Sequence, residues 1–367
     1  MTSPRVARLE RVRARMEALG VDVLLLSLGA DLPWLTGYEA MPLERLTMLV
    51  VPRGGDATLV VPRLEAPRVE EDPDVFRVRP WSESEDPVAV VAGLAGPAGS
   101  VAVSDRTWAM FVLALQATSL GAATWRPSSE VTGALRAVKD QAEVSSLAAA
   151  SAAADRVAAQ LLGGQIPLIG RSERDVSQDI GRRLVEEGHQ KVNFAIVGSG
   201  PNSASPHHEP GGRVIGAGEA VVCDFGGTMD GYCSDITRTV WTGPPTGEQR
   251  DVYRLLQTAQ AAGVASARVG VSCEAVDAAA RSIIDSAGYG EAFIHRTGHG
   301  IGLEEHEDPY IVSGNRADLV AGHAFSVEPG IYLSGRFGAR IEDIVVATGD
   351  GPLSLNRVSH DLTVVEV

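Results

Sequence analysis

The sequence is poor in cysteine, with only Cys223, Cys233 and Cys273 among 367 residues. A low and odd number of cysteines argues against a disulfide-stabilised secreted fold, and it predicts reduced thiols in a cytoplasmic chain. Cys223 and Cys233 fall in one predicted hairpin, which raises the question of a disulfide across it. We favour the simpler interpretation that both are small apolar side chains in the core of a sheet.

Long apolar runs are also absent, since no stretch approaches the roughly 20 apolar residues that a membrane-spanning helix needs. The basic residues between positions 5 and 15 are not followed by a sustained apolar segment, so an export signal is not expected. Apolar residues recur there at helical spacing, which predicts a helix capped by Ser3, with Pro4 in its first turn and Gly20 at its end. We expect its basic residues to form a solvated face, with no membrane as partner.

Positive charge is scarce, because 32 Lys and Arg stand against 47 Asp and Glu and give a formal net charge of −15. A surface that binds nucleic acid needs a clustered excess of Lys and Arg. Nucleic acid is therefore not expected as a partner, and bound cations would cancel part of the negative charge.

The length of the chain predicts about two domains with separate cores, and the pattern changes near residue 133. Before that point short apolar runs alternate with helical patterns, which predicts an α/β layer. The expected strands cover 21–28, 46–51 and 57–61, and the expected helices cover 86–94 and 108–118. No phosphate-binding glycine loop follows these strands.

After residue 133 the pattern predicts an α+β domain with a curved antiparallel sheet backed by helices. A long Ala-rich helix over 135–162 is expected to connect the domains. Further helices are expected over 174–187, 249–264 and 273–287, the first of them capped by Ser172.

Two aspartates, Asp224 and Asp235, occur eleven residues apart in a segment that predicts a β-hairpin. Asp230-Gly231 is a strong signal for a two-residue turn, and that turn places Asp235 opposite Gly226. Both carboxylates then project from one face as diagonal neighbours, roughly 7–8 Å apart at the backbone. Acids held so close repel each other and raise each other's pKa, so we expect a cation between them.

Three more candidate ligands follow, namely His299, Glu328 and Glu342. The segments of Glu328 and Glu342 flank Gly335-Arg-Phe-Gly338, which predicts a second hairpin whose register the sequence does not fix. Four carboxylates and one imidazole form a hard, oxygen-rich set that suits Mn²⁺ better than a thiolate-type zinc site. Four negative charges would balance two divalent cations, as in a two-metal hydrolase.

Four motifs appear in a characteristic order: the Asp-x10-Asp hairpin, the His-x3-His-Gly-x-Gly loop, Val-Glu-Pro-Gly and Arg-Ile-Glu-Asp. In this order they resemble the metallopeptidases of creatinase-type, or pita-bread, fold, and within them the Xaa-Pro dipeptidases (prolidases) and Xaa-Pro aminopeptidases. Trp34-Leu-Thr-Gly-Tyr38 is similar to a marker of that family's N-terminal domain. The resemblance spans nearly the whole chain and implies a creatinase-type domain over 1–133 and a pita-bread catalytic domain over 134–367.

The resemblance also implies roles for individual residues. Two divalent ions, Mn²⁺ first with Co²⁺ or Zn²⁺ as alternatives, would be bridged by Asp235 and Glu342. The implied metal ligands are Asp224, Asp235, His299, Glu328 and Glu342. The implied catalytic residues are His207, His306 and Glu328, and the implied substrate-binding residues are His207, His295, His306 and Arg340. A homodimer is implied as well.

Other residues keep a simpler interpretation. Arg340 could instead form an ion pair with Glu342 or Asp343. His208 is expected to be only a neighbour of His207. Structural or solvent-exposed positions are expected for the remaining histidines, His189, His323 and His360.

The resulting expectation is metal-dependent hydrolysis of the bond between an N-terminal residue and a following proline in short peptides, with a dipeptidase favoured. An Xaa-Pro aminopeptidase acting on longer peptides is the main alternative. A metal-free creatinase-like amidinohydrolase and a non-catalytic peptide-binding module are disfavoured, because all five ligand positions are filled. A methionine aminopeptidase would normally lack a preceding domain such as residues 1–133.

Overall fold

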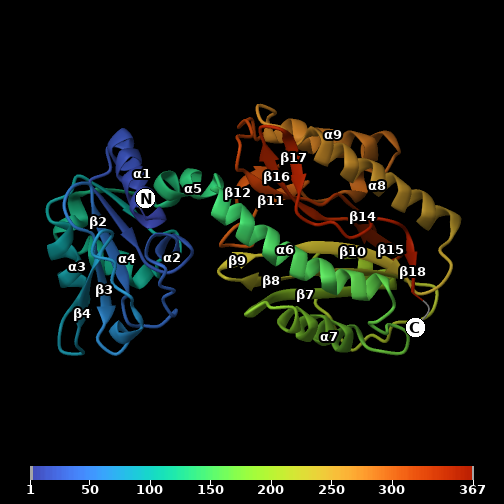
Figure 1. The fold of residues 1–367 in the computed structure, drawn as a ribbon, viewed down its shortest axis with the longest axis horizontal. Coiled ribbons are helices and arrows are strands. Elements are labelled where there is room, and N and C mark those ends of the chain that lie inside the picture. The colour runs from blue at the N-terminus through green and yellow to red at the C-terminus, as the bar shows by residue number, and fades with distance from the viewer. Residues whose placement is uncertain (1–2, 366–367) are drawn as a thin grey trace. The chain divides into compact units, whose positions relative to one another are not determined.

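The computed structural model describes residues 3–365, and the chain divides into two compact units (Figure 1). Unit 1 is Met1–Arg136 and unit 2 is Ala137–Val367. No helix within the described residues is long and apolar enough to cross a membrane.

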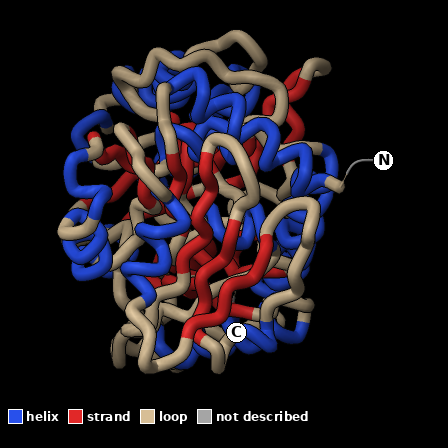
Figure 2. Tube along the Cα trace, turned by 90° about the vertical axis from the view of Figure 1, so that its left-hand side faces the viewer, coloured by secondary structure: helices blue, strands red, loops and turns tan. Residues whose placement is uncertain are grey.

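Unit 1 is built on a six-stranded mixed sheet, and Figure 2 draws the strands in red and the helices in blue. The strands, in the spatial order β4-β3-β2-β1-β5-β6, are Arg77–Trp81, Thr58–Pro62, Met48–Pro52, Val23–Leu26, Ser100–Val103 and Thr124–Pro127. The β1–β2 and β2–β3 pairs are antiparallel, and the other three pairs are parallel. This is the predicted α/β layer, with three strands (β4, β5 and β6) that the sequence analysis missed.

The helices of this part are α1 Pro4–Leu19, α2 Asp31–Thr36, α3 Pro87–Ala95, α4 Ala109–Gln116 and α5 Ser129–Ala137. Helix α1 ends as predicted at Gly20, whose φ of 66° is left-handed. Two details of the prediction are wrong. Ser3 occupies the N-cap position, but its side chain makes no capping hydrogen bond. Arg8 is half-buried rather than solvated, because it donates to the Trp34 carbonyl (2.9 Å) and stacks on the Trp34 ring.

The single helix predicted over 135–162 is also wrong, because the chain breaks between α5 and α6 (Gln141–Leu162). Asp140 starts the second helix with a capping box, in which Asp140 and Glu143 each accept from the other's backbone N–H. Val138, in the break, pairs with His323 of a distant segment.

Unit 2 contains two larger sheets and a separate hairpin. The first sheet holds β7 Lys191–Ser199, β8 Ala220–Met229, β9 Tyr232–Cys233, β10 Ile236–Trp241 and β18 Thr363–Val364. The second holds β11 Gly298–Gly300, β12 Glu307–Ile311, β13 Ala324–Val327, β16 Asp343–Thr348 and β17 Gly351–Ser354, and the hairpin is β14 Gly330–Leu333 with β15 Phe337–Arg340. All strand pairs in this unit are antiparallel except β10–β18.

Helices cover these sheets, as the sequence predicts. Helix α6 and helix α7 (Glu173–Glu186) pack on the first sheet, and α8 (Gly247–Ser266) and α9 (Cys273–Ser286) pack together beside the second (Figure 1). Apolar cores lie between the layers, for example around Phe225 under α7 and around Phe325 under α9. The three cysteines are buried and unpaired, which confirms the prediction that Cys223 and Cys233 are small core residues of a sheet.

Candidate metal centre

The first acidic hairpin has the register that its turn predicts. Asp230 and Gly231 both have positive φ, 49° and 84°, as a two-residue turn of type I′ requires. Strand β8 pairs with β10 so that Asp224 lies opposite Thr237. The same register places Asp235 opposite Gly226, where a Cβ would lie 2.0 Å from the Ser234 carbonyl oxygen.

The second acidic hairpin brings Glu328 and Glu342 opposite each other. Gly330 pairs with Arg340 at one end, and Val327 pairs with Asp343 at the other. Glu328 and Glu342 lie between these two pairs, and one register holds throughout. An isolated bridge from Thr237 to Glu342 joins the two hairpins, so all four acids meet in one place.

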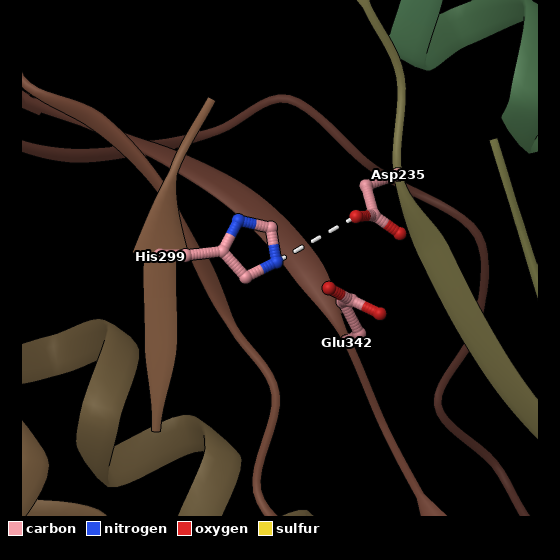
Figure 3. A group of neighbouring side chains, drawn as sticks. All are labelled: Asp235, His299 and Glu342. Carbon is pink, nitrogen blue, oxygen red and sulfur yellow. Dashed lines mark ion pairs between the residues drawn. The ribbon is translucent and has the colours of Figure 1, made fainter. Parts of the chain in front are cut away.

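Three of the predicted ligands form a tight group, in which Asp235, His299 and Glu342 point toward one another from three separate segments (Figure 3). Each offers one ligand atom, and these atoms lie within 4.8 Å of one another. His299 Nε2 is 3.7 Å from Asp235 Oδ2 and 3.3 Å from Glu328 Oε1. Asp224 and Glu328 lie outside the tight group but line the same cavity.

The chemistry of this set fits a divalent cation. Asp224 Oδ1 and Asp235 Oδ1 are buried and have no hydrogen-bond partner among residues 3–365, which is costly for a carboxylate oxygen unless another group satisfies it. Burial, together with the neighbouring acids, raises the pKa of Asp235 and Glu342 well above the usual values and that of Glu328 to about 7. A cation would supply the positive charge that these groups lack.

His299 has the uncharged imidazole that a metal ligand needs. Burial and the nearby His306 lower the pKa of His299 to about 3, so the imidazole is uncharged at neutral pH. Its backbone N–H donates to Ser326 Oγ (3.0 Å), and the Ser326 hydroxyl donates to Glu328 Oε1 (3.1 Å). Ser326 therefore ties two of the predicted ligands together.

Arg340 has a different partner from those considered in the sequence analysis. Its guanidinium forms a buried ion pair with Asp224, not with Glu342 or Asp343. It also donates to Thr237 Oγ1 (2.9 Å) and to the Tyr332 hydroxyl (3.0 Å). The Asp343 carboxylate instead forms an ion pair with Arg238 (2.8 Å). Substrate binding by Arg340 therefore stays a prediction.

Two residues that the sequence did not single out, Thr237 and Tyr332, order this centre. Thr237 donates to Glu342 Oε2 (2.6 Å) and accepts from Arg340, so it links a predicted ligand to the arginine. The Tyr332 hydroxyl contacts both Arg340 and His295 Nε2 (2.9 Å). Thr237 could have been found from the hairpin register, which puts it opposite Asp224, whereas Tyr332 carries no such signal.

One cavity of about 410 Å³ is lined by all nine residues that were predicted to bind metal, to catalyse or to bind substrate. They are His207, Asp224, Asp235, His295, His299, His306, Glu328, Arg340 and Glu342. Its other lining residues are Phe194, Ile196, Pro206, Arg296 and Glu305. Burial and the Arg340 charge lower the pKa of His295 to about 3, and burial also lowers the pKa of His306. The lining of the cavity thus combines carboxylates, two histidines with lowered pKa values and apolar side chains.

The remaining histidines make structural contacts. His189 Nε2 lies 2.8 Å from Ser234 Oγ, and His360 Nε2 lies 2.7 Å from Asp343. His323 Nδ1 accepts from the Val320 N–H (3.4 Å). His208 turns away from the cavity toward Glu173, with 2.8 Å between Nε2 and the carboxylate.

Comparisons with known proteins agree with this geometry. Residues 142–349 match the model of metallopeptidase family M24, and residues 8–138 match that of the creatinase/prolidase N-terminal domain. The chain is 45% identical to a probable dipeptidase PepE of Mycobacterium tuberculosis, covering 98% of this chain and 96% of that one. It is 34% identical to an Xaa-Pro dipeptidase of Lactobacillus helveticus, covering 98% and 99%.

A solved structure gives the same picture. The prolidase from Thermococcus sibiricus superimposes with a TM-score of 0.93 at 37% identity, covering 99% of each chain. The likeness therefore extends over both units of the chain.

Proposed function

This chain belongs to metallopeptidase family M24, and we propose that it is an Xaa-Pro dipeptidase that works with two divalent ions, Mn²⁺ in the first place. The observation that carries the proposal is the meeting of two acidic hairpins and His299 at one buried point. The named relatives support the choice of a dipeptide with proline in second position.

In this proposal Asp224, Asp235, His299, Glu328 and Glu342 hold the ions. Divalent ions bound there would polarise the scissile carbonyl and lower the pKa of an attacking water. Glu328, whose pKa burial raises to about 7, would accept a proton from that water. His207 and His306, both at the cavity wall, would donate hydrogen bonds to the oxygen on which negative charge develops.

The residues that line the cavity support proline as a substrate residue. Phe194, Ile196 and Pro206 give the lining apolar surface that suits a pyrrolidine ring, because the ring has no N–H that needs a partner. His295 is held by the Tyr332 hydroxyl and contributes a neutral polar edge to the same cavity.

A dipeptidase must also bind a free carboxylate just beyond the proline, and a cation does this best. Arg340 is the candidate from the sequence, although its guanidinium already donates three hydrogen bonds, to Thr237, Tyr332 and Asp224. Arg296 is a second cation that lines the cavity, and it makes no ion pair within residues 3–365. Either arginine would favour dipeptides over longer substrates.

A peptide panel tests the proposal. Metal-reconstituted protein should cleave an Xaa-Pro dipeptide faster than the matching Xaa-Pro-Xaa tripeptide, and it should leave Met-Ala uncleaved. Efficient cleavage of the tripeptide would favour the aminopeptidase alternative, and cleavage of Met-Ala without preference for proline would overturn the assignment.

Several further features belong to the same proposal. They are the functional domains over 1–133 and 134–367, a cytoplasmic location and a homodimer. A sedimentation run that shows only a 38.5 kDa species at working concentration would contradict the dimer.

A further inference from the structure

Glu173, the first residue of α7, is a fully buried carboxylate that lies outside the metal-ligand set. A buried charge is costly unless hydrogen bonds compensate for it. The N-terminus of α7 does not need Glu173, because Ser172 and Asp175 already form a complete capping box. Its burial must therefore have another cause.

The cause lies in the loop that follows β7. Glu173 Oε1 accepts from the N–H and the hydroxyl of Ser199 (2.8 Å each), and both carboxylate oxygens accept from Asn202 Nδ2 (3.0 and 3.1 Å). Glu173 Oε2 lies 2.8 Å from His208 Nε2. Burial raises the pKa of Glu173, but these hydrogen bonds outweigh it and leave the pKa below its usual value. One carboxylate thus holds the start, the middle and the end of the segment 199–208.

The same segment is also fixed on its other side. Ser203 Oγ accepts from the N–H of Gly338 in β15 (2.8 Å), and a Cβ at Gly338 would lie 2.2 Å from the Ser203 carbonyl oxygen. Strand β15 is the one that carries Arg340. The loop is therefore pinned between α7 and the arginine strand of the metal centre.

His207 lies directly between these anchors. Its side chain is exposed at the cavity, and within the described part of the chain it makes no hydrogen bond or ion pair of its own. The backbone of His207, from which its imidazole projects, is consequently positioned by its neighbours, and the next residue, His208, is bound to Glu173.

We propose that Glu173 is a positioning residue that, through His208 and the segment 199–208, fixes His207 over the substrate cavity. The inference rests on the proposed function for its catalytic readout. A shift of about 1 Å in a group that contacts a reacting atom can cost about 100-fold in rate, so a small loosening of the loop would be measurable.

A double-mutant cycle tests the coupling at a temperature where every variant is folded. His207→Asn is expected to lower kcat/KM about 100-fold. Glu173→Gln should lower it about 10-fold alone but less than about 2-fold in the His207→Asn background. A purely structural role for Glu173 would give losses that multiply in the double variant, and that result would overturn the proposal.

Two further variants keep the test decisive if Glu173→Gln folds poorly. His208→Ala removes the contact to Glu173 and should behave like Glu173→Gln. His208→Gln places an amide N–H near the position of Nε2 and should recover most of the activity, whereas equal loss in both would contradict the proposal. Glu274→Gln is the control, because Glu274 is a partly exposed acid in the first turn of α9, and the activity of this variant should be unchanged.

Hydrogen exchange tests the clamp without any substrate. The amides of Ser199 and His208 should exchange at least about 10-fold faster in Glu173→Gln, with no change in α9. Unaltered exchange would overturn the clamp whatever the activity. If the wild-type protein cleaves no Xaa-Pro peptide, the proposed function fails, and the exchange result alone decides the role of Glu173.

Discussion

Thr237 shows how a single hydroxyl orders the proposed metal centre. It donates to Glu342 and accepts from Arg340, which in turn holds Asp224. Groups that orient metal ligands in this way typically contribute 10–100-fold to metal affinity or activity. The hairpin register places Thr237 opposite Asp224, so the sequence could predict the location of Thr237 but not its partners on the other hairpin.

Removal of the Thr237 hydroxyl is therefore a direct test. Thr237→Val keeps the side-chain shape, and it should weaken Mn²⁺ binding by about 10-fold or more, measured by titration calorimetry. Thr237→Ser retains the hydroxyl and should stay within about 3-fold of the wild type. Equal affinities in the valine and serine variants would contradict the orienting role.

The cysteines give a prediction about reactivity. Burial raises the pKa of Cys223 and Cys233 to about 12 and that of Cys273 to about 11, so thiolate is scarce at pH 8. Folded protein treated with iodoacetamide at pH 8 should carry no carbamidomethyl group by intact mass, and urea-unfolded protein should carry three. Rapid labelling of the folded chain would contradict the burial of these thiols.

The sequence predicts residue positions better than residue partners. The Asp230-Gly231 turn was enough to place Asp235 against Gly226, because a two-residue hairpin has only one register. The pairing of Arg340 with Asp224 could not be predicted, because it joins two hairpins whose mutual placement is set by the whole sheet arrangement.

At the level of elements, local chemistry decides where helices begin. Asp140 and Glu143 interrupt a continuous helical pattern, because their reciprocal capping bonds favour a new helix start. Strands β4 and β6 were missed for a different reason. They are edge strands with Arg and Pro residues, so their apolar alternation is weak.

The capping box can be tested by chemical denaturation. Asp140→Ala should lower the free energy of unfolding by about 1 kcal/mol, because Glu143 N–H loses its acceptor. Ser3→Ala is the matched control, since Ser3 holds an N-cap position without a side-chain bond. Its unfolding midpoint should hardly move, and a larger loss for Ser3→Ala than for Asp140→Ala would contradict the assignment.

At the scale of the whole molecule, the predicted combination of an α/β unit with a pita-bread catalytic unit is confirmed by the family matches over 8–138 and 142–349. Four short motifs in a fixed order were sufficient to predict the catalytic unit, because each contains a turn of the fold or a predicted metal ligand. Oligomeric state and metal identity depend on surfaces and ions that no motif encodes.

Metal binding by the whole protein should depend on pH with a definite sign. Burial and neighbouring acids raise the pKa of Glu328 to about 7 and raise those of Asp235 and Glu342, so protons must leave before Mn²⁺ binds. His299, with a pKa of about 3, contributes no proton near neutrality. For each pH unit below 7, the affinity for Mn²⁺ should fall by up to about tenfold for every proton that metal binding releases.

Calorimetry at pH 6 and pH 8 in buffers of different ionisation enthalpy measures both the affinity and the released protons. Proton release at pH 6 should exceed that at pH 8. Equal affinity at the two values, with no proton release at either, would show that the acids are already ionised in the metal-free protein.

The central claim is that the two acidic hairpins and His299 form a dinuclear peptidase centre. It is tested most directly by measuring hydrolysis of an Xaa-Pro dipeptide while Mn²⁺ is titrated into chelator-stripped protein. The account predicts no turnover without metal, a rise that saturates near two equivalents per chain, and loss of most activity in Glu342→Gln. Full turnover by the stripped protein, or by Glu342→Gln, would contradict it.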